Sequence, residues 1–250
     1  MSLGTVGKAL RLLELLSTYD APVRLSELSR DADMNKSTAY RLLETMRNGG
    51  YVQQDEPNGR YMITTKMWQI GIRAFQRQDI RSIAKPYLDT LARETDEPAV
   101  LAILEGLDVV IVDRSASSQA VQTVSLIGSR TPIHCSSLGK AFMMGRQDEG
   151  LSYLKLPLRQ FTPRTITRIA DLRENVKQAV AAGIATGFDE YDEGVSGVSA
   201  PVMGGDNKVH CAIGITLPSA RAEGPAFELC KKTVREQASL LSAQLGYNPG

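Results

Sequence analysis

Cysteine and histidine are scarce in this sequence, which has 3 cysteines and 2 histidines in 250 residues. The cysteines Cys135, Cys211 and Cys230 are odd in number and far apart along the chain. That pattern argues against a disulfide framework and for a reducing compartment. We therefore expect a cytoplasmic protein.

Long hydrophobic runs are also missing. No apolar run approaches the roughly 18 residues that a membrane-spanning helix needs, and the N-terminus lacks the basic stretch and apolar stretch of a secretion signal. The hydrophobic fraction of 42% and the charged fraction of 23% are typical of a globular protein. We expect no membrane association, and the length allows one small and one larger domain.

An excess of one charge sign is lacking too, because the formal net charge is only +1. Residues 1–64 contain eight basic and eight acidic side chains. If this region binds DNA, its basic groups must be sorted onto one face, since attraction to phosphate depends on local rather than summed charge.

The N-terminal region has the element order of a winged helix-turn-helix. Apolar residues recur at helical spacing over 4–18 and 25–32, and another helix is expected to begin at Asn35 or Lys36. A Gly-Gly pair ends that helix, and strands at 51–54 and 60–63 are expected to pair across a Pro-Asn-Gly turn. We therefore predict a DNA-binding domain over residues 1–64, with the hairpin as its wing.

The third of these helices is the expected DNA-reading element. Ala39, Leu42, Leu43 and Met46 form its apolar stripe, and the opposite side is polar, basic and aromatic. An ordinary solvated helix face is the alternative interpretation.

The candidate DNA-binding side chains on that face and in the wing are Lys36, Ser37, Thr38, Tyr40, Arg41 and Arg60. We expect Arg41 and Ser37 to face the bases and the others to lie nearer the DNA backbone. Glu44 is expected to pair with Arg41 rather than to accept from a cytosine.

Residues 65–79 are expected to form a linker helix, and residues 80–250 a second domain. Its strands and helices mix without strict βαβ alternation, which predicts an α+β fold with an antiparallel sheet. After a first helix through Leu91, strands are expected at 99–104, 109–112, 122–127, 197–203 and 209–217, and helices at 138–144, 169–182 and 227–245.

Several short motifs resemble those of IclR-type bacterial regulators, in the same order and over nearly the whole chain. They lie at 6–10, 36–43, 50–52, 84–88, 128–134, 138–141, 194–195 and 200–202. The resemblance implies a DNA-binding regulator, not an enzyme, that forms a dimer or a dimer of dimers. It also implies a GAF-like C-terminal domain that binds a metabolite, commonly a small organic or aromatic acid.

The resemblance also implies an effector pocket. Its residues map to Thr123, Thr131, Ser137, Leu138, Val195, Gly197, Gly214 and Thr216. Ser136 joins them, because small hydroxyl residues just before a helix favour an anion such as a carboxylate. Glycines at 187, 197 and 214 depart from the pattern of keto-acid binders in the family, and we expect a roomier pocket.

Competing functions have weaker support in the sequence. Ser137 and Lys140 have the S-x-x-K spacing of penicillin-binding enzymes, but the partner motifs of those enzymes are missing. A plain helix N-cap is the alternative for Ser136 and Ser137. His134-Cys135 and His210-Cys211 keep a metal site open as a hypothesis, although we expect no cofactor.

The linker helix has enough apolar residues to pair with a second copy, and two reading heads suit a pseudo-palindromic operator in double-stranded DNA. We therefore expect a homodimer or a dimer of dimers with a small-molecule effector. A ligand or metal sensor that acts through protein partners, with the N-terminal module as an interaction domain, remains the alternative.

Overall fold

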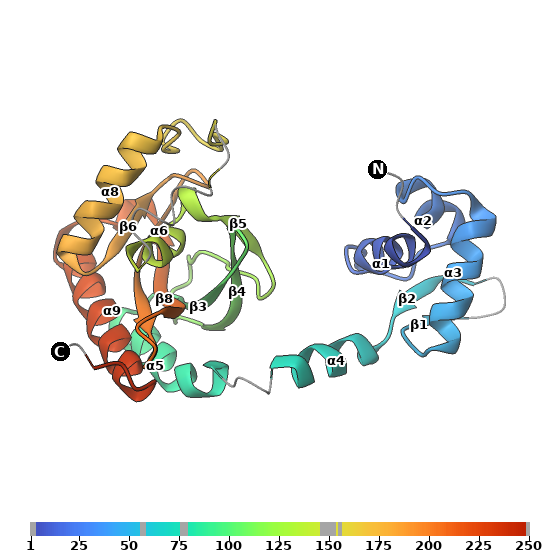
Figure 1. The fold of residues 1–250 in the computed structure, drawn as a ribbon, viewed down its shortest axis with the longest axis horizontal. Coiled ribbons are helices and arrows are strands. Elements are labelled where there is room, and N and C mark those ends of the chain that lie inside the picture. Colours follow the sequence, from blue (N-terminus) through green and yellow to red (C-terminus); the bar gives the residue numbers. More distant parts are fainter. Residues whose placement is uncertain (1–3, 56–58, 76–79, 146–153, 155–156, 249–250) are drawn as a thin grey trace. The chain divides into compact units, whose positions relative to one another are not determined.

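The computed structural model describes residues 4–55, 59–75, 80–145, 154 and 157–248 (Figure 1). The chain divides between Asp79 and Ile80 into two compact units. No helix in the described part of the chain is long and apolar enough to cross a lipid bilayer.

The first unit is a winged helix-turn-helix. It contains α1 (Thr5–Leu16), α2 (Leu25–Asp31) and α3 (Lys36–Asn48), followed by the antiparallel hairpin of β1 (Val52–Gln54) and β2 (Tyr61–Ile63). The helices and the hairpin share one apolar core, in which Leu12, Leu28, Leu43 and Tyr61 are fully or almost fully buried. This confirms the predicted fold of the N-terminal region.

Local interactions define where α3 begins and where the wing follows it. The Asn35 side chain accepts a hydrogen bond from the Thr38 amide at 2.9 Å, which caps α3 at its N-terminus. After the helix, Gly50 has a φ of +74°, a left-handed conformation that glycine adopts without strain. The chain can therefore turn sharply from α3 into β1.

The helix after the wing, α4, runs from Thr65 to Phe75. A helix was predicted over residues 65–79, and its last part, 76–79, lies outside the described residues.

The second unit is an α+β fold around an antiparallel six-stranded sheet with the strand order β5-β4-β3-β8-β7-β6. The strands are β3 (Ala99–Glu105), β4 (Asp108–Ser115), β5 (Arg130–Pro132), β6 (Ala185–Phe188), β7 (Val195–Met203) and β8 (Val209–Pro218). Every paired strand in it is antiparallel, as predicted from the mixed order of strands and helices.

Helices cover both faces of this sheet (Figure 1). One apolar cluster joins the sheet to α5 (Ile80–Thr95) and α9 (Gly224–Gln244), and a second joins it to α6 (Ser137–Met144) and α8 (Ile169–Ala182). Two short 3₁₀ turns, η1 (Ile133–Cys135) and η2 (Ser219–Arg221), complete the unit among the described residues.

The strand predicted at 122–127 is wrong. That segment has no strand pairing, and its apolar side chains Val124 and Leu126 are exposed rather than packed. The edge of the sheet beside β4 is occupied instead by β5, whose residues pair with Asp108, Val109 and Val110. Alternation of apolar residues therefore did not by itself make a strand.

Gly139 allows a close contact between α6 and η1. A Cβ atom at this position would overlap the backbone carbonyl of Ile133 in η1, so α6 sits on η1 at a distance that only glycine allows. Backbone cannot yield as a flexible side chain can, and the helix would have to shift.

We expect Gly139→Ala to lower the free energy of unfolding by about 2 kcal/mol, the usual cost of overpacking. Urea unfolding followed by circular dichroism measures it. Gly4→Ala is the control, because its Cβ would meet no atom within 4 Å and its φ is −62°. A Gly139→Ala protein as stable as the Gly4→Ala protein would contradict the packing argument.

Candidate functional site

The outward face of α3 carries the side chains predicted to read DNA. Lys36, Ser37, Tyr40 and Arg41 are exposed, with Tyr40 at 45% of its full accessible area. Thr38 is half-buried, and its amide is used by the Asn35 cap. The opposite face is buried through Ala39, Leu43 and Met46. The helix thus presents a polar, basic surface from a packed support.

Arg41 is available to a partner because Glu44 does not pair with it, contrary to the prediction. Glu44 accepts instead from Arg47, one turn further along α3, at 2.7 Å. An acidic residue N-terminal to its basic partner suits the helix dipole better than the reverse order. Within the described residues, no carboxylate lies within ion-pair distance of the Arg41 guanidinium.

Arg60 lies in the wing and is exposed. Its carbonyl accepts a hydrogen bond from the Asp55 amide at 3.1 Å, which holds the two arms of the hairpin together. The tip of the wing, residues 56–58, lies outside the described residues.

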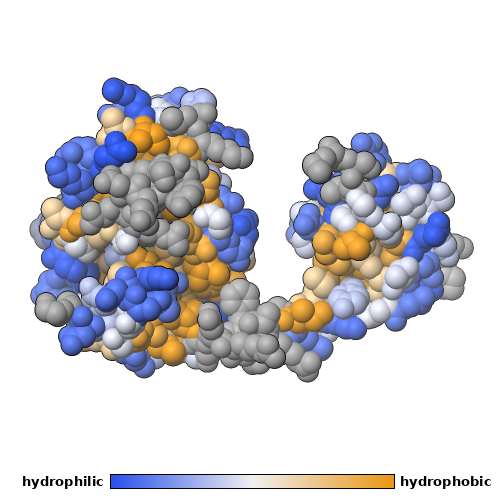
Figure 2. All heavy atoms as spheres, in the orientation of Figure 1, coloured by the Kyte–Doolittle hydropathy of each residue, from blue (hydrophilic) through white to orange (hydrophobic). Residues whose placement is uncertain are grey.

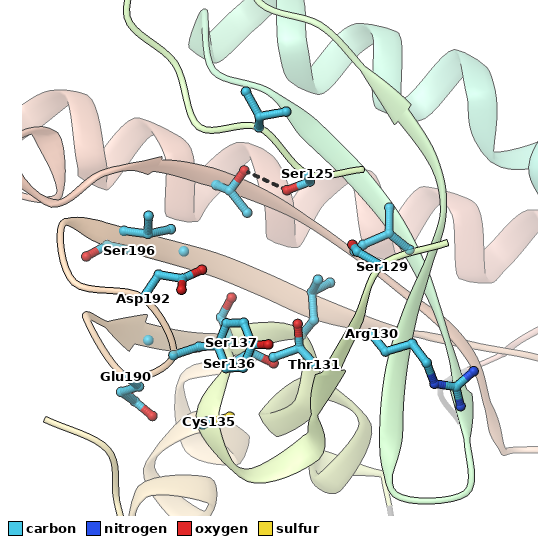
Figure 3. Close-up of a pocket in the computed structure, with 18 of the residues that line it drawn as sticks. Ser125, Ser129, Arg130, Thr131, Cys135, Ser136, Ser137, Glu190, Asp192 and Ser196 are labelled. Carbon is cyan, nitrogen blue, oxygen red and sulfur yellow. Dashed lines mark hydrogen bonds between the residues drawn. The ribbon is translucent and has the colours of Figure 1, made fainter. Parts of the chain in front are cut away.

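A cavity of about 260 Å³ opens in the second unit, between the sheet, the N-terminus of α6 and the segment that joins β6 to β7 (Figure 3). Of the residues predicted to bind an effector, those lining it are Thr131, Ser136, Ser137, Leu138, Val195, Gly197 and Thr216. Apolar side chains such as Ile111 and Leu138 alternate with these hydroxyl groups. The lining therefore suits a small ligand with both apolar and hydrogen-bonding parts.

Two predicted pocket residues lie outside this lining. Thr123 donates its hydroxyl to the hydroxyl of Thr216, a lining residue, at 2.7 Å. Gly214 lies against β7, where an added Cβ would collide with the Ser199 side chain and meet the Val198 carbonyl oxygen at 2.6 Å. The expectation that Gly214 enlarges the pocket is therefore wrong, because Ser199 already fills that space.

The two serines at the start of α6 have different roles. Ser136 is the N-cap, and its hydroxyl accepts from the Gly139 amide at 3.1 Å. Ser137 is buried, with its hydroxyl 2.8 Å from that of Ser199 and directly beneath Gly197. Their hydroxyl groups are thus engaged within the protein.

The amides of Ser137 and Leu138 remain unengaged. Neither donates a hydrogen bond to an acceptor in the described part of the chain. Gly187 lies beside them, and a Cβ there would stand 3.1 Å from the Ser137 nitrogen. The missing side chain leaves these amides, at the positive end of the helix dipole, open to the cavity.

A buried ion pair behind the cavity escaped prediction. Lys140 is 0% exposed, and its ammonium group donates to Glu190 Oε1 at 2.6 Å and to the Thr186 carbonyl at 3.1 Å. Burial lowers the pKa of Lys140, and the Glu190 carboxylate opposes that effect. Glu190 is 8% exposed, and its Oε2 has no hydrogen-bond partner among the described residues.

This pair connects the segment that joins β6 to β7 with α6, and so links two of the elements that line the cavity. The sequence does not indicate this pairing, because Lys140 is noticed only as part of a short motif and Glu190 is one of several acidic residues in 189–193. Fifty positions separate the partners.

Cys135 also lines the cavity, and its thiol donates to the Pro132 carbonyl at 3.3 Å. Burial raises the pKa of Cys135 to about 12. The thiol is therefore protonated at neutral pH and a poor nucleophile.

The two histidines have different partners and do not form a common site. His134 contacts the Arg159 carbonyl at 2.9 Å, whereas the exposed His210 pairs with Asp206 at 2.8 Å. No group of three or more His, Cys, Asp or Glu side chains that could hold a metal ion occurs in the described part of the chain. The hypothesis of a metal site built on the His-Cys pairs thus gains no support from the geometry.

Two family models match the chain. The model described as IclR helix-turn-helix domain matches residues 5–56, and the model described as bacterial transcriptional regulator IclR C-terminal matches residues 72–243.

Curated relatives match over almost the full chain. The DNA-binding transcriptional repressor YiaJ of Escherichia coli is 30% identical over 96% of this chain and 87% of its own length. The HTH-type transcriptional regulator XynR of the same organism is 28% identical over 97% of both chains.

A solved IclR homologue from Microbacterium hydrocarbonoxydans, complexed with 4-hydroxybenzoate, has the same fold. It superposes with a TM-score of 0.83 over 97% of this chain and 99% of its own, at 24% sequence identity.

Proposed function

Because the chain belongs to the IclR family of bacterial transcriptional regulators, we propose that it is an effector-responsive regulator that binds a specific operator. Residues 1–64 bind the DNA, residues 65–79 link the two domains, and residues 80–250 bind the effector. One observation carries the proposal: α3 exposes Arg41, which has no ion pair among the described residues, beside Lys36, Ser37 and Tyr40 on a buried apolar support. A major groove accepts such a helix, and arginine reads guanine through two hydrogen bonds.

The effector of this proposal is a small organic acid bound in the cavity of the second unit. The amides of Ser137 and Leu138, which have no acceptor in the part of the chain that the structure describes, offer donors at a helix N-terminus, where a carboxylate is favoured. Aromatic acids belong in the candidate set, because the cavity has apolar walls and a fold neighbour is complexed with 4-hydroxybenzoate.

The effector acts by changing the populations of two conformations that differ in affinity for the operator. Linkage then requires that operator DNA change the affinity for the effector by the same factor. The test begins with a thermal-shift screen of small carboxylic and aromatic acids on the full-length chain, since binding to the folded state raises the melting temperature.

The second step measures operator affinity with and without the saturating acid, and acid affinity with and without operator. We expect changes of about tenfold that agree in both directions. Unchanged affinities in both directions would contradict the regulatory mechanism. Binding of the N-terminal domain to protein but not to DNA, without the steep salt dependence of phosphate contacts, would favour the sensor alternative.

We also propose that the regulator is a dimer that pairs through α4. Met67, Trp68 and Ile70 are exposed on this helix, with Trp68 at 68%, and Figure 2 shows hydrophobic residues at its surface. At 100° per residue, these three side chains lie within one half of the helix circumference, and Gln69 lies on the other.

Trp68→Glu should weaken the dimer at least about tenfold, because a charge would enter an apolar interface and a large aromatic contact would be lost. Sedimentation equilibrium over a concentration series measures the dissociation constant. Gln69→Glu adds the same charge to the opposite side of α4 and should leave it unchanged. Equal effects of the two variants would exclude α4 pairing through the apolar side.

A further inference from the structure

The charge of the effector cavity narrows the class of acid that can bind there. In the described lining, Arg130 carries the cationic side chain, and its guanidinium is paired with residues outside the lining. Its guanidinium bonds Glu105 at 2.8 Å and Asp108 at 3.4 Å, and Figure 3 shows it extending away from the cavity.

The carboxylates of the lining are placed differently. Glu190 is neutralised on one oxygen by Lys140 behind the wall. Asp192 has no ion pair or side-chain hydrogen bond within the described residues, and Figure 3 shows its carboxylate turned toward the cavity. The lining therefore contains an exposed carboxylate that no cation of the described residues neutralises, together with the open amides at the start of α6.

From this arrangement, and resting on the proposed effector function, we infer that Asp192 determines specificity. It accepts a hydrogen bond from a hydroxyl or ammonium group on the effector, whose single carboxylate binds the amides of Ser137 and Leu138. The effector class is thus a hydroxylated or amino-bearing monocarboxylic acid. A second carboxylate would lie against Asp192, and the repulsion between like charges would exclude a dicarboxylate.

Two matched series of acids test this inference on the full-length chain. One has the aromatic ring, as benzoate, 4-hydroxybenzoate, 4-(aminomethyl)benzoate and terephthalate. The other has the three-carbon chain, as propionate, 3-hydroxypropionate, 3-aminopropionate and succinate. Thermal shift ranks the acids, and isothermal titration calorimetry gives dissociation constants for those that bind.

In at least one series, a donor-bearing acid should bind about tenfold more tightly than its parent acid, and the dicarboxylate more weakly than the parent. Asp192→Asn keeps an oxygen acceptor but removes the charge. The Asp192→Asn protein should retain most of its preference for the hydroxylated acid over the parent acid. Its preference for the amino-bearing acid should fall about tenfold, and the dicarboxylate should no longer bind more weakly than the parent acid.

Glu193→Gln is the matched control, because Glu193 is exposed like Asp192 but lies outside the lining, and the substitution should change none of these ratios. A dicarboxylate as the tightest ligand, or the same ratios in the Asp192→Asn protein, would overturn the inference while leaving an acid effector in place. Failure of every acid in both series and in the wider screen would overturn the proposed effector class itself.

Discussion

Lys140→Met should lower the free energy of unfolding by about 3–5 kcal/mol, the cost of removing one partner of a buried ion pair. The substitution keeps an unbranched side chain of similar length, so the cavity left behind is small. It leaves the Glu190 carboxylate buried without a cation, because Oε1 loses the Lys140 ammonium group. The other oxygen, Oε2, already lacks a hydrogen-bond partner among the described residues. The Thr186 carbonyl loses its donor as well. Urea unfolding followed by circular dichroism measures the change.

The double variant Lys140→Met with Glu190→Leu separates the ion pair from general packing. Replacing both charges with apolar groups removes the unpaired carboxylate, and such replacements are often close to neutral. We expect the double variant to recover at least about 2 kcal/mol of the loss in the single variant. Equal stability of the two variants, or a loss below about 1 kcal/mol in the single one, would show that the pair does not hold the wall.

Helical periodicity predicted much of the fold because helices such as α3 and α8 have one buried face. The α8 helix spans Ile169–Ala182, the range expected from the sequence, and α3 begins at the predicted position, after the Asn35 cap. The edge strands β5 and β6 were missed. They have 3 and 4 residues, too few for alternation to be recognised. Unlike the similarly short strands β1 and β2, they were not indicated by a turn motif between them.

In the pocket too, features set by a contiguous segment were predicted, whereas contacts between distant residues were not. Family motifs located Leu138, and the chemistry of a helix start added Ser136, because the start of α6 is a contiguous segment with its own capping chemistry. They did not reveal that Gly214 faces Ser199, or that Lys140 meets Glu190, since each contact joins residues brought together only by the folded sheet. The engagement of Ser137 by Ser199 likewise depends on the register of the sheet and α6.

The hardest feature to predict was which charged side chains of the proposed sites form ion pairs within the protein. On α3, sequence spacing allowed Glu44 to pair with either Arg41 or Arg47, and only the choice of Arg47 leaves Arg41 open. At the cavity, Arg130 belongs to a family motif, but the motif does not indicate where its side chain points. Its bonds to Glu105 and Asp108 leave it unavailable to an anion in the cavity. Both outcomes follow from competition among partners, which spacing alone cannot rank.

Arg41→Ala should weaken operator binding by about 100-fold, because a bidentate contact to guanine and its charge are lost together. The operator is first selected from a random DNA pool with the unaltered protein, and the same selected duplex is then used for every variant. Gel-shift titrations at fixed salt give the dissociation constants. The domain should remain folded, since Arg41 is exposed and the core of α3 consists of Ala39, Leu43 and Met46.

Two further variants assign the role of Arg41. Arg41→Lys keeps the charge but loses the two-pronged geometry, so a base contact predicts a loss nearly as large as that of Arg41→Ala, whereas a phosphate contact predicts near-normal affinity. Arg47→Ala is the control on the same helix, because Arg47 is held by Glu44, and it should cost less than about threefold. If Arg41→Ala bound the selected operator as tightly as Arg47→Ala, α3 would not be the reading element in the orientation proposed.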